Sequence, residues 1–296
     1  MRRLRALAFA VSLVFAAPLL AQPFGPPLAP EVAQVRDLLR AGQVDDAIAQ
    51  AEKATAARAE DGKAWLWLGN AYGRKALEVG MLSKPKWAGK CRDAYEKAVA
   101  VSPSDPDARL SLMQYYLQAP GFLGGGRDKA EAQAAAMQSI GPAWGHIGRA
   151  ALLLSDDKND EAVAAYQDAL AADPTNHRAA LGVISLHIGA KRFAEARQVT
   201  DAALARDPRD PVGLYMRGRI AIDDGQDIDQ GIESLATYIT LENRPEELGL
   251  AAAWWRKGLL LEKVGRKEDA VQALRKAVEL DQRLEPAKKD LERLES

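Results

Sequence analysis

Two stretches of the chain carry the same pattern. The first reads Asp-Glu-Ala-Val-Ala-Ala-Tyr-Gln-Asp-Ala-Leu-Ala-Ala-Asp-Pro and ends at Pro174, and the second reads Ala-Glu-Ala-Arg-Gln-Val-Thr-Asp-Ala-Ala-Leu-Ala-Arg-Asp-Pro and ends at Pro208. The two prolines lie 34 residues apart, as do two pairs of alanines, Ala162 with Ala196 and Ala169 with Ala203. A period of this length is typical of stacked helical hairpins, because no single hairpin can bury its apolar face alone.

The residues at the repeated positions are of the types that a helical hairpin needs. Small residues are expected where two helices cross closely, larger ones between them, and a proline where the second helix ends. The best copies are Trp65, Leu68, Gly69 and Tyr72 for a first helix, and Ala162, Tyr166, Ala169 and Pro174 for a second helix. These residues resemble the tetratricopeptide repeat family. The resemblance implies an all-α fold, a right-handed α-solenoid of about seven repeats over residues 31–296, with a polar capping helix at about 284–296.

Two repeats are longer than the pattern allows. About ten extra residues fall within 75–89 of the second repeat, and about five fall within 119–126 of the third. Both insertions are expected at the turn between the two helices of their repeat, so the sequence predicts adjacent loops on one edge of the solenoid. Their apolar content predicts a packed lobe, with Trp87 and Phe122 partly sheltered, although two disordered loops remain an alternative. The residues assigned to this lobe are Met81, Leu82, Trp87, Phe122 and Leu123.

The N-terminus has the three parts of a secretory signal peptide. A basic start is followed by an apolar run from Ala6 to Ala17, and we expect cleavage after Ala21. An uncleaved anchor is the alternative, but the run is shorter than the roughly 20 residues of a spanning helix. Residues 1–21 are therefore predicted to be a signal peptide, residues 22–30 a proline-rich linker, and the protein periplasmic and without an integral membrane span. The long turns likewise resemble those of exported bacterial members of the family.

Composition and motifs provide little support for catalysis, metal binding or nucleic-acid binding. The 296 residues carry a formal net charge of −1, which argues against nucleic acid as a partner. The one cysteine, Cys91, occupies a small crossing position and is expected to be buried rather than reactive. The three histidines are too far apart in sequence for a metal site, and Gly121 to Lys129 lacks the Gly-Lys-Ser/Thr of a phosphate-binding loop. The sequence therefore predicts no catalytic residues, no metal, no cofactor and no enzymatic activity.

In this family the second, fifth and ninth positions of each first helix face inward, which implies a partner-binding groove. Members that clamp a terminal carboxylate have Lys at the fifth position and Asn at the ninth; Asn70 fits, but Leu66 does not. We therefore expect an apolar or aromatic-bearing peptide, with Trp144, Tyr215, Arg219 and Trp255 as anchors. The alternative is that fifth-position residues only pack neighbouring first helices together. The predicted groove residues are Leu66 and Asn70, Leu110 and Gln114, Trp144 and Ile147, Leu181 and Ser185, Tyr215 and Arg219, and Trp255 and Leu259.

These observations favour a non-enzymatic periplasmic scaffold that binds a peptide or partner protein in its concave groove. The alternative is an accessory subunit of a cell-envelope complex for assembly, secretion or polysaccharide export. An enzyme that uses the repeats as a framework is a third hypothesis, without residues to support it.

Overall fold

The computed structural model describes residues 28–242, 244–245 and 248–296. All regular secondary structure in this part of the chain is helical, with fifteen α-helices and one short 3-10 helix. The predicted signal peptide and most of the predicted linker lie outside the described residues. The α-helices are α1 Pro30–Arg40, α2 Val44–Ala57, α3 Gly62–Glu78, α4 Lys84–Val101, α5 Pro106–Gln118, α6 Arg127–Met137, α7 Pro142–Ser155, α8 Asn159–Ala172, α9 His177–Gly189, α10 Phe193–Arg206, α11 Pro211–Asp224, α12 Ile228–Ile239, α13 Leu250–Lys263, α14 Lys267–Leu280 and α15 Glu285–Glu295, and the 3-10 helix η1 is Gly121–Leu123.

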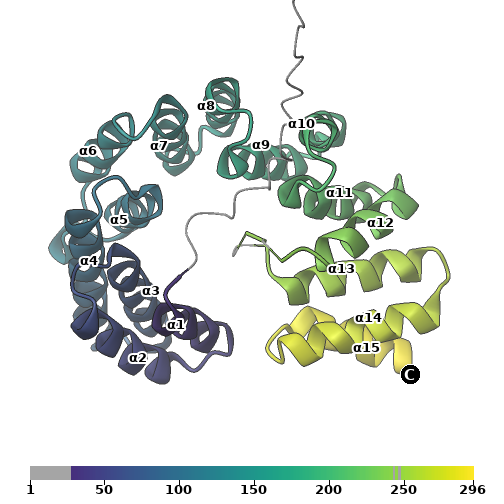
Figure 1. Cartoon of the computed structure of the whole chain (residues 1–296), viewed down its shortest axis with the longest axis horizontal. Coiled ribbons are helices and arrows are strands. Elements are labelled where there is room, and N and C mark those ends of the chain that lie inside the picture. The colour runs from purple at the N-terminus through teal and green to yellow at the C-terminus, as the bar shows by residue number, and fades with distance from the viewer. Residues whose placement is uncertain (1–27, 243, 246–247) are drawn as a thin grey trace, which may run out of the picture.

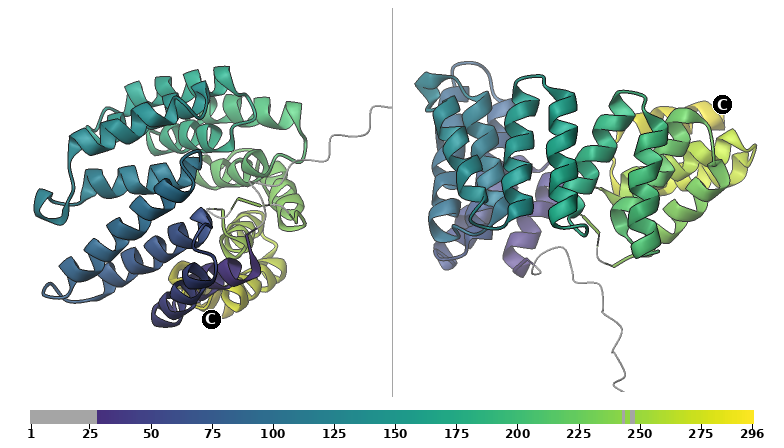
Figure 2. Two further views of the ribbon diagram at one scale, coloured as in Figure 1. Left: turned by 60° about the vertical axis from the view of Figure 1, so that its left-hand side comes forward. Right: turned by 90° about the horizontal axis from the view of Figure 1, so that it is seen from above.

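The helices form seven antiparallel hairpins, α1–α2 to α13–α14, followed by α15 against α14. The hairpins stack into an α-solenoid, as the sequence predicts. Odd-numbered helices up to α13 line the inner side of a curved array, and even-numbered helices lie outside (Figure 1). The axes of neighbouring helices are roughly aligned and the chain reverses direction at each turn, so the connecting turns collect at two opposite edges (Figure 2).

Close crossings between neighbouring helices depend on small residues. A Cβ atom added to Gly258 would lie 2.9 Å from Leu274 Cγ, and one added to Gly69 would overlap the ring of Tyr95. The repeated alanines Ala169 and Ala203 are similarly enclosed, at 0% and 4% exposed. These side chains let the two helices approach without a gap, and the larger neighbours fill the space around them.

Four of the seven first helices, α3, α5, α9 and α11, begin at side-chain caps. The carboxylate of Asp61 accepts hydrogen bonds from the backbone N–H groups of Lys63 and Ala64, and Asp105 and Asp210 cap α5 and α11 in the same way. Asn176 caps α9 by accepting from the N–H of Ala179. Each cap satisfies a backbone donor at the helix start, and all four lie at the same edge of the solenoid because the first helices run in the same direction.

The two ends of the array approach each other. A Cβ atom on Gly42, in the α1–α2 turn, would overlap the guanidinium of Arg283, which lies between α14 and α15. Figure 1 shows the first and last hairpins side by side at the opening of the curve. Seven repeats therefore bend the solenoid almost into a ring.

The two insertions have different structures. The first is not a long loop, because α3 continues to Glu78 and α4 starts at Lys84, leaving only five residues between them. The second forms η1 and a glycine turn that lie against α4. The extra residues of the first insertion therefore mostly lengthen helices.

A buried crossing position can be tested by overpacking. Ala169→Leu should destabilise the protein by about 1–3 kcal/mol, because the added atoms must displace the first helix of the same hairpin. Ala171→Leu is the matched control, since Ala171 lies on the same helix but is exposed. Urea and thermal unfolding followed by circular dichroism measure both. Equal midpoints for the two variants would contradict the assigned crossing.

Candidate functional site

The inner face of the solenoid is the candidate site. Each first helix contacts the next first helix as well as its own hairpin partner, from α1 with α3 to α11 with α13. The inner face is therefore a continuous strip of helix surface, and its side chains must share a tightly curved space.

Four of the twelve predicted groove residues are buried and do not present their side chains to a partner. Leu66 is 5% exposed and packs with Ala98 and Ala108, so it joins the second repeat to the third. This corrects the expectation that all twelve residues are available for binding, and the packing alternative holds at these positions. The four are Leu66, Leu110, Ile147 and Tyr215, with exposed fractions of 5%, 7%, 1% and 4%.

Tyr215 and Trp255, two of the expected anchors, have internal partners. Tyr215 packs edge-on against Tyr238, and its hydroxyl accepts a 2.8 Å hydrogen bond from Arg256 Nη1. Burial raises the pKa of Tyr215 and lowers the pKa of Arg256. Trp255 Nε1 donates to the Asp290 carboxylate at 2.8 Å, which ties α13 to the capping helix. Substitution of either aromatic residue would therefore disturb the fold before it disturbed an interface.

The remaining predicted groove residues keep part of their surface accessible. Among them Asn70 Oδ1 already accepts a 2.8 Å hydrogen bond from the Tyr95 hydroxyl. Trp144 and Leu181 lie partly against the core and partly open, on two successive first helices. The accessible set is Asn70, Gln114, Trp144, Leu181, Ser185, Arg219, Trp255 and Leu259.

Charged residues follow the edge at which the first helices begin. Lys63 Nζ lies 3.0 Å from an Asp105 carboxylate oxygen and 2.9 Å from Asp107 Oδ2. Arg178 Nη2, on α9, donates to Asp107 Oδ1 at 3.0 Å, and His177 Nε2 lies 3.0 Å from Asp210 Oδ2. We call Lys63, Asp105, Asp107 and Arg178 the ionic belt.

The ionic belt shows how tightly the inner face curves. Asp107 is on α5 and Arg178 is on α9, with the whole α7–α8 hairpin between them in the chain. Sequence reasoning placed the second position of each first helix on the inner face, but it singled out only the fifth and ninth positions. The signal that could have found the belt is the column of opposite charges, Lys63, Asp107 and Arg178, at that second position.

The charges of the ionic belt shift the pKa values of its own residues. Burial alone would raise the pKa of Asp107, but Lys63 and Arg178 outweigh it, so the pKa lies below its ordinary value. For Lys63 burial acts to lower the pKa, and the two aspartates raise it above its usual range. Both shifts stabilise the charged forms at neutral pH.

The predicted lobe residues do not pack into one lobe. Trp87 is half-buried, but it lies against Tyr72, with ring centroids 5.7 Å apart, rather than against the second insertion. Phe122 is 82% exposed, which contradicts the expectation that it is sheltered. Met81 and Leu82 are also exposed, whereas Leu123 is half-buried. The reason is that α3 and α4 absorb the extra residues, so little chain is left to fold back over the apolar side chains.

Among the described residues, side chains that could act in catalysis or bind a metal do not cluster. Cys91 is 5% exposed, and burial raises the pKa of its thiol to about 12. In the described part of the chain, no group of three or more His, Cys, Asp or Glu side chains is placed to hold a metal ion. None of the described helices is long and apolar enough to cross a membrane.

Family models identify the repeats. Models described as tetratricopeptide repeat match residues 32–78, 153–220 and 251–284, which together cover about half of the chain. The chain belongs to the tetratricopeptide repeat family. The matches fall on the first hairpin and α3, on the centre of the array, and on the last hairpin.

Solved structures have the same architecture at low identity. The yeast protein Tom70 is 16% identical, with a TM-score of 0.52 over 92% of this chain and 58% of Tom70. Cut9–Hcn1, described as a hetero-tetramer of APC/C, is 16% identical, with a TM-score of 0.51 over 89% of this chain and 48% of the matched chain. A tetratricopeptide repeat protein from Parabacteroides merdae is 15% identical, with a TM-score of 0.48 over 90% and 98% of the two chains. This chain thus spans about half the length of Tom70 and of the Cut9–Hcn1 chain, and these similarities show the fold alone. No curated protein sequence matches it.

The ionic belt predicts a component of stability that acid removes. Because the folded pKa of Asp107 is depressed, its contribution is complete above the pKa of the unfolded chain, about 4, and is lost as pH falls through the lower folded value. The Asp107 side chain is 40% exposed, so solvent screens the interaction and the expected contribution is roughly 1 kcal/mol or less.

Asp107→Asn should therefore lower the urea midpoint at pH 7 and reduce the fall in stability between pH 5 and pH 3. Glu60→Gln, in the exposed turn before α3, is the control for loss of one carboxylate. A double-mutant cycle of Asp107→Asn with Arg178→Ala isolates the bridge between α5 and α9. Additive effects in that cycle would mean that the bridge contributes nothing.

Proposed function

We propose that this protein is a non-catalytic scaffold that binds an extended segment of a partner protein along its inner face. The family's repeat fold supports a role in protein–protein interaction, and the inner face supports this mode of binding. The observation that carries the proposal is the series of accessible side chains on consecutive first helices, Gln114, Trp144, Leu181 and Ser185 on α5, α7 and α9.

The curvature favours an extended partner over a folded one. A side chain on α5 reaches one on α9, so the inner surface at this point is narrow. A folded domain would meet the rim formed by the ionic belt, whereas a single peptide strand can lie along the strip. Half-exposed aromatic and aliphatic side chains such as Trp144 and Leu181 supply the apolar anchors that dominate binding energy at interfaces.

We further propose that the scaffold acts in the periplasm. The support is the N-terminal sequence alone, with its basic start, its apolar run and Ala21 at the expected cleavage site. A permanent place in an envelope complex is the second form of the same proposal. It predicts that the partner co-purifies with a membrane protein under mild extraction.

Site-specific crosslinking tests the assigned face. A photoreactive residue at Ser185, on the inner face, should capture one discrete partner in intact cells. The same residue at Ala171, exposed on an outer helix, should not capture that partner. Capture from position 171 alone would place the interface on the outer side.

The captured partner then allows a binding measurement. Trp144→Ala and Leu181→Ala should each weaken binding by about 2 kcal/mol, roughly a 30-fold rise in Kd, because each removes an apolar anchor. Trp254→Ala is the matched control, since Trp254 is half-buried and lines a depression between α12 and α14. Unfolding midpoints must be compared, because Trp144 also packs on the core. Unchanged binding in both folded variants would refute the inner face as the site.

A further inference from the structure

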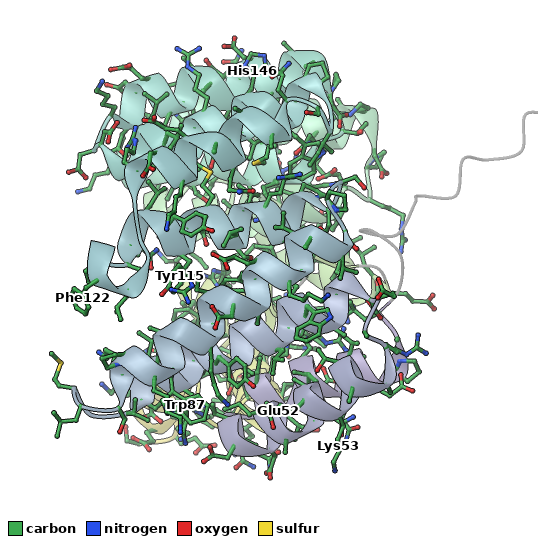
Figure 3. All side chains as sticks on the ribbon, turned by 90° about the vertical axis from the view of Figure 1, so that its left-hand side faces the viewer. Glu52, Lys53, Trp87, Tyr115, Phe122 and His146 are labelled. Atoms are coloured by element: carbon green, nitrogen blue, oxygen red, sulfur yellow. The ribbon has the colours of Figure 1, made fainter. Side chains whose placement is uncertain are left out.

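One edge of the second and third repeats exposes large apolar side chains. Leu77 is 75% exposed, Met81 80%, Leu82 101% and Phe122 82%. The other exposed large apolar residues of the described chain are Val264 and Leu280, at 39% and 42%. We call Leu77, Met81, Leu82 and Phe122 the apolar edge. Figure 3 shows the α3–α4 turn and the labelled Phe122 projecting from the same side of the molecule.

Phe122 is held in its exposed position by its neighbours. The carbonyl of Leu123 accepts hydrogen bonds from the Tyr115 hydroxyl at 2.8 Å and from Arg92 Nη1 at 3.2 Å. The next carbonyl, that of Gly124, accepts from Lys129 Nζ at 2.9 Å. Gly124 has a φ of +85°, which favours glycine and ends η1. Donors from three helices therefore fix the backbone on which Phe122 points into solvent.

The α3–α4 turn is equally short and ordered. The carbonyl of Gly80 accepts from the backbone N–H groups of Ser83 at 3.0 Å and Lys84 at 3.1 Å. This closed turn leaves Met81 and Leu82 exposed at its tip. Apolar side chains presented on ordered backbone usually mark an interaction surface.

The charge around the turn identifies the partner's chemistry. Residues 74–90 contain five basic residues and one acidic residue, although the whole chain has a net charge of −1. Arg74, Lys75 and Lys90 lie in ion pairs with Glu78, Asp45 and Glu52, so the charge at the tip comes from the two remaining lysines. Lys84 and Lys86 directly follow the tip, and Lys86 Nζ lies 5.6 Å from the Trp87 ring centroid. Trp87 is half-buried at the base of the turn, where α4 begins. Apolar tips with lysines directly behind them match the boundary of the acyl chains and the headgroup layer of an anionic membrane surface.

We propose that the apolar edge inserts into the surface of a lipid bilayer with anionic headgroups. Met81, Leu82 and Phe122 enter the boundary of the acyl chains, Leu77 follows, and Lys84 and Lys86 contact lipid phosphates. A bilayer fits better than a protein here, because separate protruding tips need no matching cavities in a fluid surface. The lysines add attraction that depends on the lipid charge and on salt.

A vesicle-binding assay tests the proposal with the protein as it is purified from the cells that produce it. The protein should sediment with vesicles that contain phosphatidylglycerol and bind at least tenfold more weakly to pure phosphatidylcholine. Met81→Ser/Leu82→Ser/Phe122→Ser should reduce the binding at least tenfold. The control is Val264→Ser/Leu280→Ser, which removes the milder exposed apolar residues of the last repeat and should leave binding unchanged. Equal loss in both variants, or equal binding to both lipids, would overturn the proposal.

A charge-reversal test distinguishes attraction by Lys84 and Lys86 from attraction of anionic vesicles to basic residues elsewhere on the protein. Lys84→Glu/Lys86→Glu should lower binding to anionic vesicles several-fold more than Lys263→Glu/Lys267→Glu, which makes the same change of charge at exposed positions in the last repeat. If the two pairs lose binding equally, the attraction is not localised at the apolar edge and the proposal fails.

A local probe excludes binding through any other segment, including the apolar run near the N-terminus. In a Cys91→Ala background, an environment-sensitive fluorophore attached to Leu82→Cys or Phe122→Cys should shift to the blue and be quenched by spin-labelled lipids. The same fluorophore at Ala171→Cys should do neither. Quenching at none of these positions while the protein still sediments would refute the proposal, and so would protection of the edge by a captured protein instead of lipid.

Discussion

The close approach of two helices at a small residue is the contact on which the rest of this structure depends. Gly69 against Tyr95 and Gly258 against Leu274 leave no space for a single added carbon atom. Each first helix can then contact its own partner and the first helix of the next hairpin as well. Stability is thereby distributed as a series of neighbour contacts along the array, without a central core.

The same geometry decides which inner residues can be used for binding. Since successive first helices touch, fifth-position side chains such as Leu66 and Leu110 are enclosed between repeats. A surface that needs those side chains for its own cohesion cannot also offer them to a partner. The inner face is left with the edges of Trp144 and Leu181, the polar ninth positions and the ionic belt. These groups favour a ligand that makes apolar contacts along its length and polar contacts at one rim.

The sequence predicted the hairpins well because their determinants are local. Ala162, Ala169 and Pro174 recur at a fixed period, and each has a physical reason to occupy its place whatever the rest of the chain does. The insertion at 75–89 was located correctly but assigned the wrong structure. A repeat pattern counts extra residues without telling whether they form a loop or lengthen helices, and here Ala76 and Leu77 continue α3 while Pro85 lies in the first turn of α4.

The candidate site was less predictable because it depends on curvature. The Asp107–Arg178 bridge joins residues from repeats three and five, and no local pattern specifies that the array bends enough to bring them together. The burial of Tyr215 is similar, because it follows from Tyr238 behind it and Arg256 from the next first helix. The sequence predicts which position of the repeat each residue occupies. The exposure of each inner side chain depends on how the repeats curve in the assembled superhelix.

The two proposed surfaces are connected through α5. Tyr115, near the end of this helix, holds η1 and so presents Phe122, while Asp107, in its first turn, belongs to the ionic belt. Because all first helices run in the same direction, the apolar edge lies at their C-terminal ends and the ionic belt at their N-terminal ends. A scaffold seated on a bilayer by the apolar edge would therefore hold the ionic belt on the side away from the lipid. Its inner strip, which runs from repeat to repeat, would then lie between the lipid and the ionic belt, so that an extended partner approaching from above meets the charged rim first and the apolar anchors below it.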